Sequence, residues 1–494
     1  MKYLLFIHGW SVTDTGTYGQ LPERIAAELG IAVHHLYLGK YISFHDEVRL
    51  PDIACAMEEA VRRELALAPG ERFAAVTHST GGPVLRAWLD RFHADPAREC
   101  PLSHVIHLAA AQFGSALAQL GKGRLSRIKG YFQGVEPGKG VLDWLELGSP
   151  ESWQLNRRWI AGGGTAHAGP PVFSFSLIGQ QIDRKLYDNL NTYTGETGSD
   201  GVVRVAASNL NASAVRLLQR MPTAGQLERG SASALVPDDA GSRESARVPF
   251  RLVSGVSHSG ERMGIMNSVR DSGPVPEVVR LIRRCLEVAD GDGYRTLAEE
   301  FEAETREVVE EERVEIEDRL LFKDRVFFHD SCSMVIVRVT DDHGHVPDDL
   351  RVTFTAGNND PNKLPKGFLI DTQRNGRHRG TITFFFNHDI IHGCPAVIRE
   401  VDGKRHKFRE RLEGIDGLGM TVEAFPDTGF ARYHPAYVKS SPLILGGIIR
   451  PHATVLLDVV LKRIIHRNTM DITRDLRRGS FKRTGPGPVL ESDG

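Results

Sequence analysis

The sequence has few cysteines, little net charge and no long apolar run. Its 494 residues include five cysteines, an odd number, and none of them forms a CxxC pair. We therefore expect neither a disulfide framework nor a cysteine zinc site. The net charge of -2 gives no overall electrostatic basis for binding nucleic acid. No stretch of about 18 apolar residues occurs, so we expect no transmembrane helix.

The first ten residues, MKYLLFIHGW, could be mistaken for a secretory signal peptide. The apolar run from Tyr3 to Ile7 is too short for the hydrophobic region of such a peptide, and no small-residue cleavage site follows it. We therefore expect a protein that is made in the cytoplasm. If it is exported, we expect a route that does not read an N-terminal signal.

Apolar runs alternate with helical patterns over roughly the first 290 residues. The helical patterns include Ile53, Met57 and Val61, which repeat every four residues and so share one face of a helix. Strands that alternate with helices of about 10–15 residues are typical of βαβ units and a parallel sheet, so the sequence predicts an α/β fold. The predicted strands are 3–7, 32–38, 73–77, 103–110, 172–178 and 249–256.

The pattern changes after the α/β region, which we place at 1–292. Residues 293–318 are acidic and helix-prone, and we expect a solvated helical connector. Short β-rich runs with turn signals then predict an all-β, sandwich-like domain at 319–467. The tail at 468–494 is expected to be flexible. Within the α/β region, the stretch 222–247 is rich in Ser, Ala, Arg and Asp and is predicted to be a mobile surface loop.

Ser79 lies between a predicted strand and a predicted helix, in the stretch FAAVTHSTGG. A serine hydroxyl is a poor nucleophile, and it needs exposure, a base and donors for the developing oxyanion. A sharp strand-to-helix turn provides the exposure and requires small residues two positions before and after the serine. Thr77 and Gly81 occupy these positions, although glycine is commoner than threonine at the first. This context favours a nucleophile over an ordinary turn serine.

Two later loops supply an acid and a base in the chain order serine, carboxylate, histidine. Asp200 lies in SDGVV, and His258 lies in VSHSG directly after the last predicted strand of the α/β region. Loops at the carboxyl ends of parallel strands meet at one edge of the sheet. We expect His258 to take the proton of Ser79 and Asp200 to orient His258. Asp183 is the reserve candidate for the acid.

The loop after the first strand, His8-Gly9-Trp10, is expected to approach the nucleophile. Gly9 permits a close approach, and the backbone N–H groups of Trp10 and Thr80 are the predicted oxyanion donors. His8 is more simply interpreted as a packed or hydrogen-bonded loop histidine.

On the motifs FIHGW, THSTGG, SDGVV and VSHSG, the chain resembles the lipase and esterase branch of the α/β-hydrolase fold. The resemblance covers about residues 1–290 and does not extend into the β domain. It implies a serine hydrolase that cleaves carboxyl esters of lipids through an acyl-enzyme and needs no cofactor. With its extra β domain, the architecture is also similar to lipase effectors of type VI secretion. In that case the β domain would bind an immunity or secretion component.

The segment at about 111–170 resembles the insert after the sixth strand of bacterial lipases and phospholipases. Part of it has apolar residues at helical spacing among basic residues, and such a helix can lie on an anionic lipid surface and act as a lid. A helix packed over the sheet with solvated charges is an equal alternative. The candidate lipid-contacting residues are Arg124, Arg127, Lys129 and Phe132.

The stretch NHDIIHG contains residue types that bind metals, namely His388, Asp389 and His392. They lie in a predicted β region, where positions four apart do not share a face as they do on a helix. We therefore expect no metal site there.

Together these residues predict a lipase or phospholipase of the A type, with lipid substrate, peripheral membrane contact and no nucleic acid. One alternative is an esterase of small esters or neutral lipids, which chain-length preference would distinguish. The other is a binding or delivery protein whose β domain is the functional part. Specific association of isolated 319–470 with a protein or glycan would support that alternative.

Overall fold

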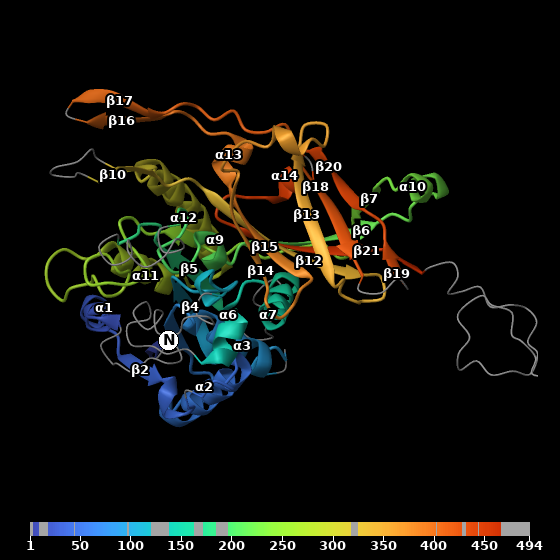
Figure 1. Ribbon diagram of the computed structural model, residues 1–494. Helices are drawn as coiled ribbons and strands as arrows, with labels where there is room; N and C mark the ends of the chain where they lie inside the picture. The colour runs from blue at the N-terminus through green and yellow to red at the C-terminus, as the bar shows by residue number, and fades with distance from the viewer. Residues whose placement is uncertain are drawn as a thin grey trace, which may run out of the picture.

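The computed structural model shows an α/β part and a β-rich part that lie side by side (Figure 1). It describes residues 3–8, 18–43, 45–95, 98–119, 138–162, 171–183, 196–317, 325–401, 403–426, 431–442 and 444–465. The predicted flexible tail lies outside these residues. Among the described helices, none has the length and apolar character needed to span a membrane.

Six parallel strands form the sheet of the α/β part, in the order β2-β1-β3-β4-β5-β9. The strands β4 and β5 are buried along their whole length, as expected for a parallel sheet covered on both faces. All six predicted strands are therefore confirmed. They are β1 (Leu4–His8), β2 (Val33–Tyr37), β3 (Phe73–His78), β4 (Leu102–Leu108), β5 (Phe173–Ile178) and β9 (Phe250–Leu252).

Helices cover this sheet and turn their apolar stripes toward it. On the third helix, Trp88 is fully buried and its indole N–H donates to Glu58 over 2.7 Å. The first helix ends at Gly30, whose φ of 63° is the left-handed conformation that suits glycine at a helix end. The helices are α1 (Leu21–Leu29), η2 (Leu38–Lys40), α2 (Leu50–Glu64), α3 (Gly81–Phe92), α6 (Lys139–Leu145), α7 (Pro150–Ala161), α9 (Val205–Ser208), α11 (Glu277–Leu286) and α12 (Gly291–Glu311).

Helix α12 occupies most of the predicted connector, but it is not a free solvated helix. Its side chains Leu297, Phe301 and Val308 are buried, and the helix lies against β9. The backbone N–H of Leu252 donates to Thr305 of α12 over 3.2 Å. The prediction of a solvated connector is therefore wrong for this face, because its apolar residues recur at helical spacing and cover the edge of the sheet.

The second sheet has ten strands in the order β13-β18-β20-β7-β6-β21-β12-β15-β14, with β8 paired to β6. In Figure 1, β6 and β7 (green) lie among the orange and red strands from the other end of the chain. The strands are β6 (Ala212–Gln219), β7 (Ser233–Pro237), β8 (Arg243–Glu244), β12 (Cys332–Asp341), β13 (Asp349–Ala356), β14 (Leu369–Arg374), β15 (Thr381–Asn387), β18 (Leu418–Phe425), β20 (Ala436–Ser441) and β21 (Thr454–Leu461).

The predicted boundary at residue 292 does not separate the two sheets, because β6, β7 and β8 precede it. Strand β6 pairs in parallel with β21, with Ala212 opposite Thr454. The prediction of a mobile loop over 222–247 is also wrong, since this stretch contains α10 (Ala224–Arg229), β7 and β8. Short strands rich in Ser, Ala and Arg carry little β propensity of their own, and here the neighbouring strands supply their order.

Both faces of the second sheet are buried at its central strands β21, β12 and β15. On β12, Met334 and Ile336 belong to the core of the α/β part, whereas Val335 and Val337 belong to a second apolar core. The sheet also curls on itself. Phe354 near one end of the strand order makes edge-to-face contacts with Phe384 and Phe386 of β15 near the other, with ring centroids 4.8 and 5.0 Å apart. This curl gives the predicted sandwich-like domain.

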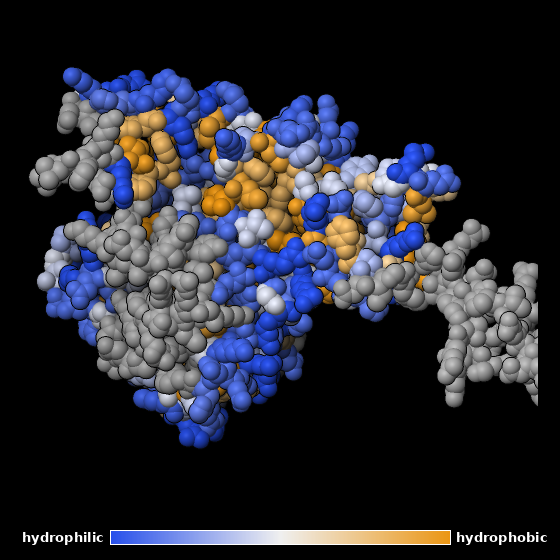
Figure 2. All heavy atoms as spheres, viewed as in Figure 1, coloured by the Kyte–Doolittle hydropathy of each residue, from blue (hydrophilic) through white to orange (hydrophobic). Residues whose placement is uncertain are grey.

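The surface reflects this arrangement. In the view of Figure 2, the α/β part shows a mainly hydrophilic surface, and apolar residues gather over the second sheet. Smaller elements complete the C-terminal half, and the β16–β17 hairpin extends away from the second sheet (Figure 1). They are β10 (Val314–Glu317), β11 (Arg325–Phe328), η3 (Pro361–Lys363), α13 (His388–His392), β16 (Val397–Val401), β17 (Lys404–Arg409), β19 (Ala431–Tyr433), α14 (Leu445–Ile448) and β22 (Arg463–Ile465).

The residues 388–392 form the short helix α13, so the prediction of a β region there is wrong. His388 and His392 share a helix face, and their rings stack with centroids 4.1 Å apart. The Nε2 atom of His392 is hydrogen-bonded to the carbonyl of Gly446 over 2.9 Å. Among the described residues, no group of three or more His, Cys, Asp or Glu side chains could hold a metal ion.

Candidate active site

Ser79 lies in a strained turn between β3 and α3. Its φ is 51°, a left-handed conformation that a non-glycine residue adopts only where the surroundings enforce it. Two backbone hydrogen bonds hold the turn to the end of β4 and the segment after it: Ser79 N–H donates to Leu108 O over 3.2 Å, and Ala111 N–H donates to Ser79 O over 3.2 Å. The turn therefore has the geometry of a nucleophile elbow.

The neighbours of Ser79 show why the turn needs small residues. A Cβ at Gly82 would lie 2.5 Å from Ala110 Cβ and 3.0 Å from Gln112 Nε2. The unusual Thr77 is accommodated because its hydroxyl lies 2.8 Å from Nδ1 of His107 on the adjacent strand. Burial, together with a nearby arginine, lowers the pKa of His107 to about 3, so this partner is neutral.

The predicted acid and base are hydrogen-bonded to each other. Nδ1 of His258 lies 2.9 Å from Oδ2 of Asp200, and both side chains are buried. The other oxygen of Asp200 accepts the backbone N–H groups of Val202 and Val203 over 3.0 and 2.8 Å. The loop backbone therefore fixes one carboxylate oxygen and leaves the other for the histidine.

A ring contact joins the elbow to the loop that carries His258. The rings of His78 and His258 have centroids 4.6 Å apart, and His78 directly precedes Ser79. Burial, and then the neighbouring His258, lower the pKa of His78 well below its usual range, so His78 is neutral there. Ser79, Asp200 and His258 follow β3, β5 and β9 at the carboxyl edge of one parallel sheet.

The remaining predicted residues have different outcomes. Thr80 is the N-cap of α3, a position whose neighbouring N–H groups have no partner within the helix. Asp183, the reserve acid, is buried, but Asp200 holds the hydrogen bond to His258. The other oxyanion donor and the candidate lipid-contacting residues lie outside the described residues: Trp10, Arg124, Arg127, Lys129 and Phe132.

The chain is similar over its whole length to phospholipase PlaB from Legionella pneumophila. A structure of PlaB in complex with thio-NAD has 38% sequence identity and a TM-score of 0.81, and the match covers 99% of each chain. A second PlaB structure gives the same values. The chain belongs to the PlaB phospholipase family. It is thus a carboxylic ester hydrolase that acts on lipid esters, and the family resemblance extends through the β domain, beyond residues 1–290.

More distant structures add nothing to this assignment. Lipase BlEst2 from Bacillus licheniformis, in its mature form, has 16% identity and a TM-score of 0.28, over 42% of this chain and 78% of that chain. No family model matches the chain, and no curated protein matches it.

Sequence reasoning missed the residues that support the site in this phospholipase. Arg204, four positions after Asp200 in the chain, is buried between Glu196 and Asp371. Glu312 accepts hydrogen bonds from the loop that leads to His258. No local signal in the sequence could have found them, because Asp371 and Glu312 lie far along the chain from the loops that they contact.

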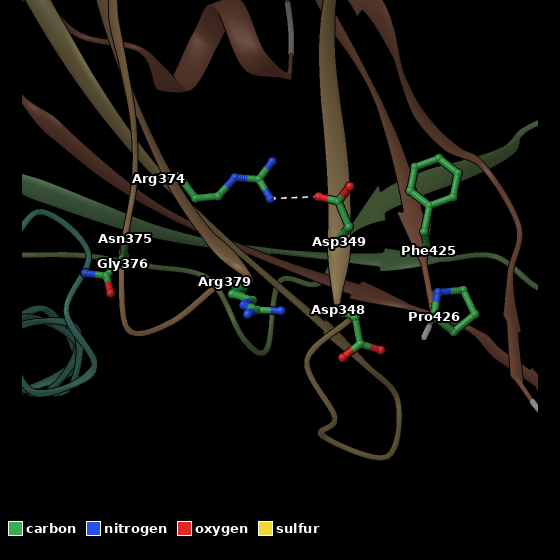
Figure 3. A pocket seen from close by; sticks show the side chains of 8 residues that line it. All are labelled: Asp348, Asp349, Arg374, Asn375, Gly376, Arg379, Phe425 and Pro426. Atoms are coloured by element: carbon green, nitrogen blue, oxygen red, sulfur yellow. Dashed lines mark hydrogen bonds and ion pairs between the residues drawn. The ribbon is translucent and has the colours of Figure 1, made fainter. Parts of the chain in front are cut away.

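A charged groove on the second sheet is not a competing ester site. It has a volume of about 500 Å³ and lies between the ends of β13 and β14, where Arg374 donates to Asp349 over 2.9 Å (Figure 3). Among the described residues that line it there is neither a hydroxyl nucleophile nor a histidine. The lining residues are Asp348, Asp349, Arg374, Asn375, Gly376, Arg379, Phe425 and Pro426.

Proposed function

We propose that the chain is a phospholipase of the A type that uses Ser79, His258 and Asp200 as a catalytic triad. One observation carries the proposal: the buried hydrogen bond between Asp200 and His258 lies beside the strained turn of Ser79. The order of the three residues in the chain is the order of α/β-hydrolase triads.

The proposed reaction has two stages. Ser79 Oγ attacks the ester carbonyl while Nε2 of His258 takes the serine proton. The backbone N–H of Thr80 stabilises the oxyanion, with that of Trp10 as the second donor expected from the sequence. His258 then gives its proton to the leaving alcohol, and an acyl-enzyme remains. A water molecule, deprotonated by His258, then attacks the acyl-enzyme ester. The fatty acid is released, and His258 returns the proton to Ser79.

The carboxylate of Asp200 has an electrostatic task in both stages. Its hydrogen bond to Nδ1 of His258 keeps Nε2 free to accept a proton, and its charge stabilises the imidazolium that forms. The two backbone donors on its other oxygen fix its orientation. Neutral His78 adds no positive charge beside His258, so it does not oppose imidazolium formation.

The substrate proposed is a glycerophospholipid. The support is that the chain belongs to the PlaB family, and that PlaB is a phospholipase. The basic segment at 124–132 is the proposed contact with an anionic lipid surface. Export without an N-terminal signal, and delivery by type VI secretion, stay predictions from the sequence.

The test measures fatty-acid release from vesicles of phosphatidylglycerol and of phosphatidylethanolamine by the full chain. Ser79→Ala should lose at least about a thousandfold in turnover with its fold intact. Ser213→Ala, a half-buried serine on β6, is the matched control and should keep full activity. Turnover unchanged by Ser79→Ala would sink the proposed nucleophile. Activity of the wild type on a short soluble ester alone would keep the triad and move the substrate to small esters.

A further inference from the structure

A buried ion pair closes the loop that carries Asp200. The loop begins at Glu196 and ends at Arg204, and the guanidinium of Arg204 donates to both oxygens of Glu196 over 2.7 and 2.8 Å. Arg204 is only 2% exposed. This bidentate pair fixes the two ends of the loop relative to each other.

The same arginine fastens the loop to the second sheet. Its guanidinium donates to Asp371 of β14 over 2.5 Å and lies over the ring of Phe385 of β15, 4.1 Å from the centroid. Burial acts to lower the pKa of Arg204, but the carboxylates of Glu196 and Asp371 outweigh it and raise the pKa. The arginine is therefore a fixed positive charge that links the acid loop to β14.

The backbone of the acid loop also lies close to the second sheet. A Cβ at Gly198 would lie 2.6 Å from Sγ of Cys332 on β12, so the loop backbone needs glycine to make this approach. Next to it, the hydroxyl of Thr197 donates to the carbonyl of Phe328 on β11 over 3.0 Å. The acid loop thus has three separate contacts with the C-terminal half.

The loop that leads to His258 is held from the same half of the chain. Glu312, the residue after α12, accepts hydrogen bonds from Ser254 Oγ over 3.1 Å and from Gly255 N–H over 2.6 Å. Its other oxygen accepts from Gln180, which follows β5, over 3.0 Å. One carboxylate therefore joins the loops after β5 and β9.

We propose that Asp371, acting through Arg204, and Glu312 are positioning residues that hold the acid and the base of the triad from the C-terminal half of the chain. The inference rests on the proposed triad. Neither carboxylate contacts Ser79, Asp200 or His258 directly, since Asp371 contacts Arg204 and Glu312 contacts Gln180, Ser254 and Gly255. Loosening either contact lets Asp200 and His258 drift apart, and a displacement of about 1 Å can cost on the order of a hundredfold in rate.

The experiment measures kcat and KM of the full chain separately on a short soluble ester. Asp371→Asn removes one charge and leaves Glu196 to pair with Arg204, so the fold is retained. We expect kcat to fall at least about tenfold and KM to change less than about twofold, as for loss of transition-state alignment without loss of binding. Glu312→Ala should have the same effect, and Glu312→Gln, which keeps an acceptor oxygen, should recover most of the kcat.

The matched control is Asp458→Asn. Asp458 on β21 pairs with Arg338 of β12 over 3.1 Å, and that guanidinium lies over the ring of Trp153 on α7, 4.5 Å from the centroid. These three residues also join the second sheet to the α/β part. Asp458 and Trp153 are buried and Arg338 is half-buried. The three contact neither the acid loop nor the loop that leads to His258. Asp458→Asn should therefore lower the melting temperature as Asp371→Asn does while leaving kcat unchanged.

Two results would overturn the proposal: a wild-type kcat in both Asp371→Asn and Glu312→Ala, or an equal loss of kcat in Asp458→Asn. Asp200→Asn, assayed in parallel, separates this failure from failure of the triad itself. An inactive Asp200→Asn beside a fully active Asp371→Asn would remove only the positioning role. An active Asp200→Asn would remove the proposed triad as well.

Discussion

The nucleophile elbow and the acid loop meet at one site but are built in different ways. Among the described residues, the hydrogen bonds that hold Ser79 and its turn lie between residues 77 and 112, and His78 adds ring contacts with Tyr18 and His258. The acid loop closes on itself through Glu196 and Arg204, and it is then fastened to Asp371, 167 positions further along the chain. One part of the site depends on a single βαβ unit, and the other depends on two sheets.

With the triad proposed above, this difference gives the second sheet a place in the chemistry as well as in the fold. The strain at Ser79 persists because the strands on each side of it and the segment after β4 over-determine its position. The acid loop lacks such strands around Asp200 and has buried ion pairs instead. The elbow is held by residues of the first half of the chain, whereas the loops of Asp200 and His258 are also held by Asp371 and Glu312 of the second half.

The largest effect should come from breaking the acid without disturbing its loop. In Asp200→Asn, the amide oxygen still accepts from Val202 and Val203, but the amide cannot hold His258 in the tautomer that accepts a proton at Nε2. We expect kcat on a soluble ester to fall about 10³- to 10⁴-fold, with unchanged circular dichroism. A loss of less than about tenfold would show that another group orients the base.

A glycine substitution should break the base loop more severely than the elbow. In Gly179→Ala, the new Cβ would lie 1.9 Å from the backbone oxygen of Val256, two residues before His258. We expect turnover to fall at least about tenfold and the free energy of unfolding to fall by about 1–3 kcal/mol. In Gly82→Ala the new Cβ meets the Cβ of Ala110 at 2.5 Å, and we expect a smaller loss of turnover.

The control for this pair is Gly291→Ala at the start of α12. There the added Cβ would lie 3.7 Å from one atom of the flexible side chain of Arg295 and would meet nothing closer. Turnover and unfolding should stay near wild type. Equal losses in all three variants would mean that the close contacts at Gly179 and Gly82 have no special importance.

Acidification should weaken the elbow and the second sheet, because each buries a neutral histidine. Burial lowers the pKa of His107 beside the elbow to about 3, and that of His452 beside β21 to about 4, from an ordinary value of 6.5. Between these values the unfolded chain binds more protons than the folded one. The stability that these groups contribute is therefore present above about pH 6.5 and lost as the pH falls toward 4 and then 3.

Denaturant unfolding at a series of pH values checks this expectation. The free energy of unfolding should fall by roughly 1 kcal/mol per buried histidine for each pH unit below about 6.5. His452→Gln should remove part of this dependence, and Ser79→Ala should leave it unchanged. Stability that is constant between about pH 7 and 5 would contradict the burial of neutral histidines.

The smallest effect on turnover should come from the unusual threonine of the elbow. Thr77→Val keeps the shape of the side chain but removes the partner of His107 Nδ1 in a buried setting. We expect a loss of about 1–3 kcal/mol in the free energy of unfolding and a turnover within about threefold of wild type. A large loss of turnover would show that the hydrogen bond at Thr77 has a direct part in catalysis.

The sequence predicted the first sheet and the elbow because their signals are local. Each of the six strands is a short run rich in apolar residues between helical patterns, and Ser79 lies among small residues at a strand-to-helix junction. Asp200 and His258 could be chosen because they follow strands in the expected chain order. The helix of His388 was mistaken for a strand, since five residues between β runs show no full helical period.

What the sequence by itself determined was therefore the α/β order, the strained turn at Ser79, and the candidates for its partners. Each of these is read from a short stretch of the chain, such as one strand, one helix or the turn between them. Only the tertiary structure decided that β6, β7 and β8, from the first half of the chain, belong to the second sheet. It also decided that Asp371 contacts the loop of Asp200 through Arg204 and that Glu312 contacts the loop that leads to His258. Pairing between strands and between buried charges leaves no periodic trace in the chain, because it joins residues whose separation along the sequence is set by the fold.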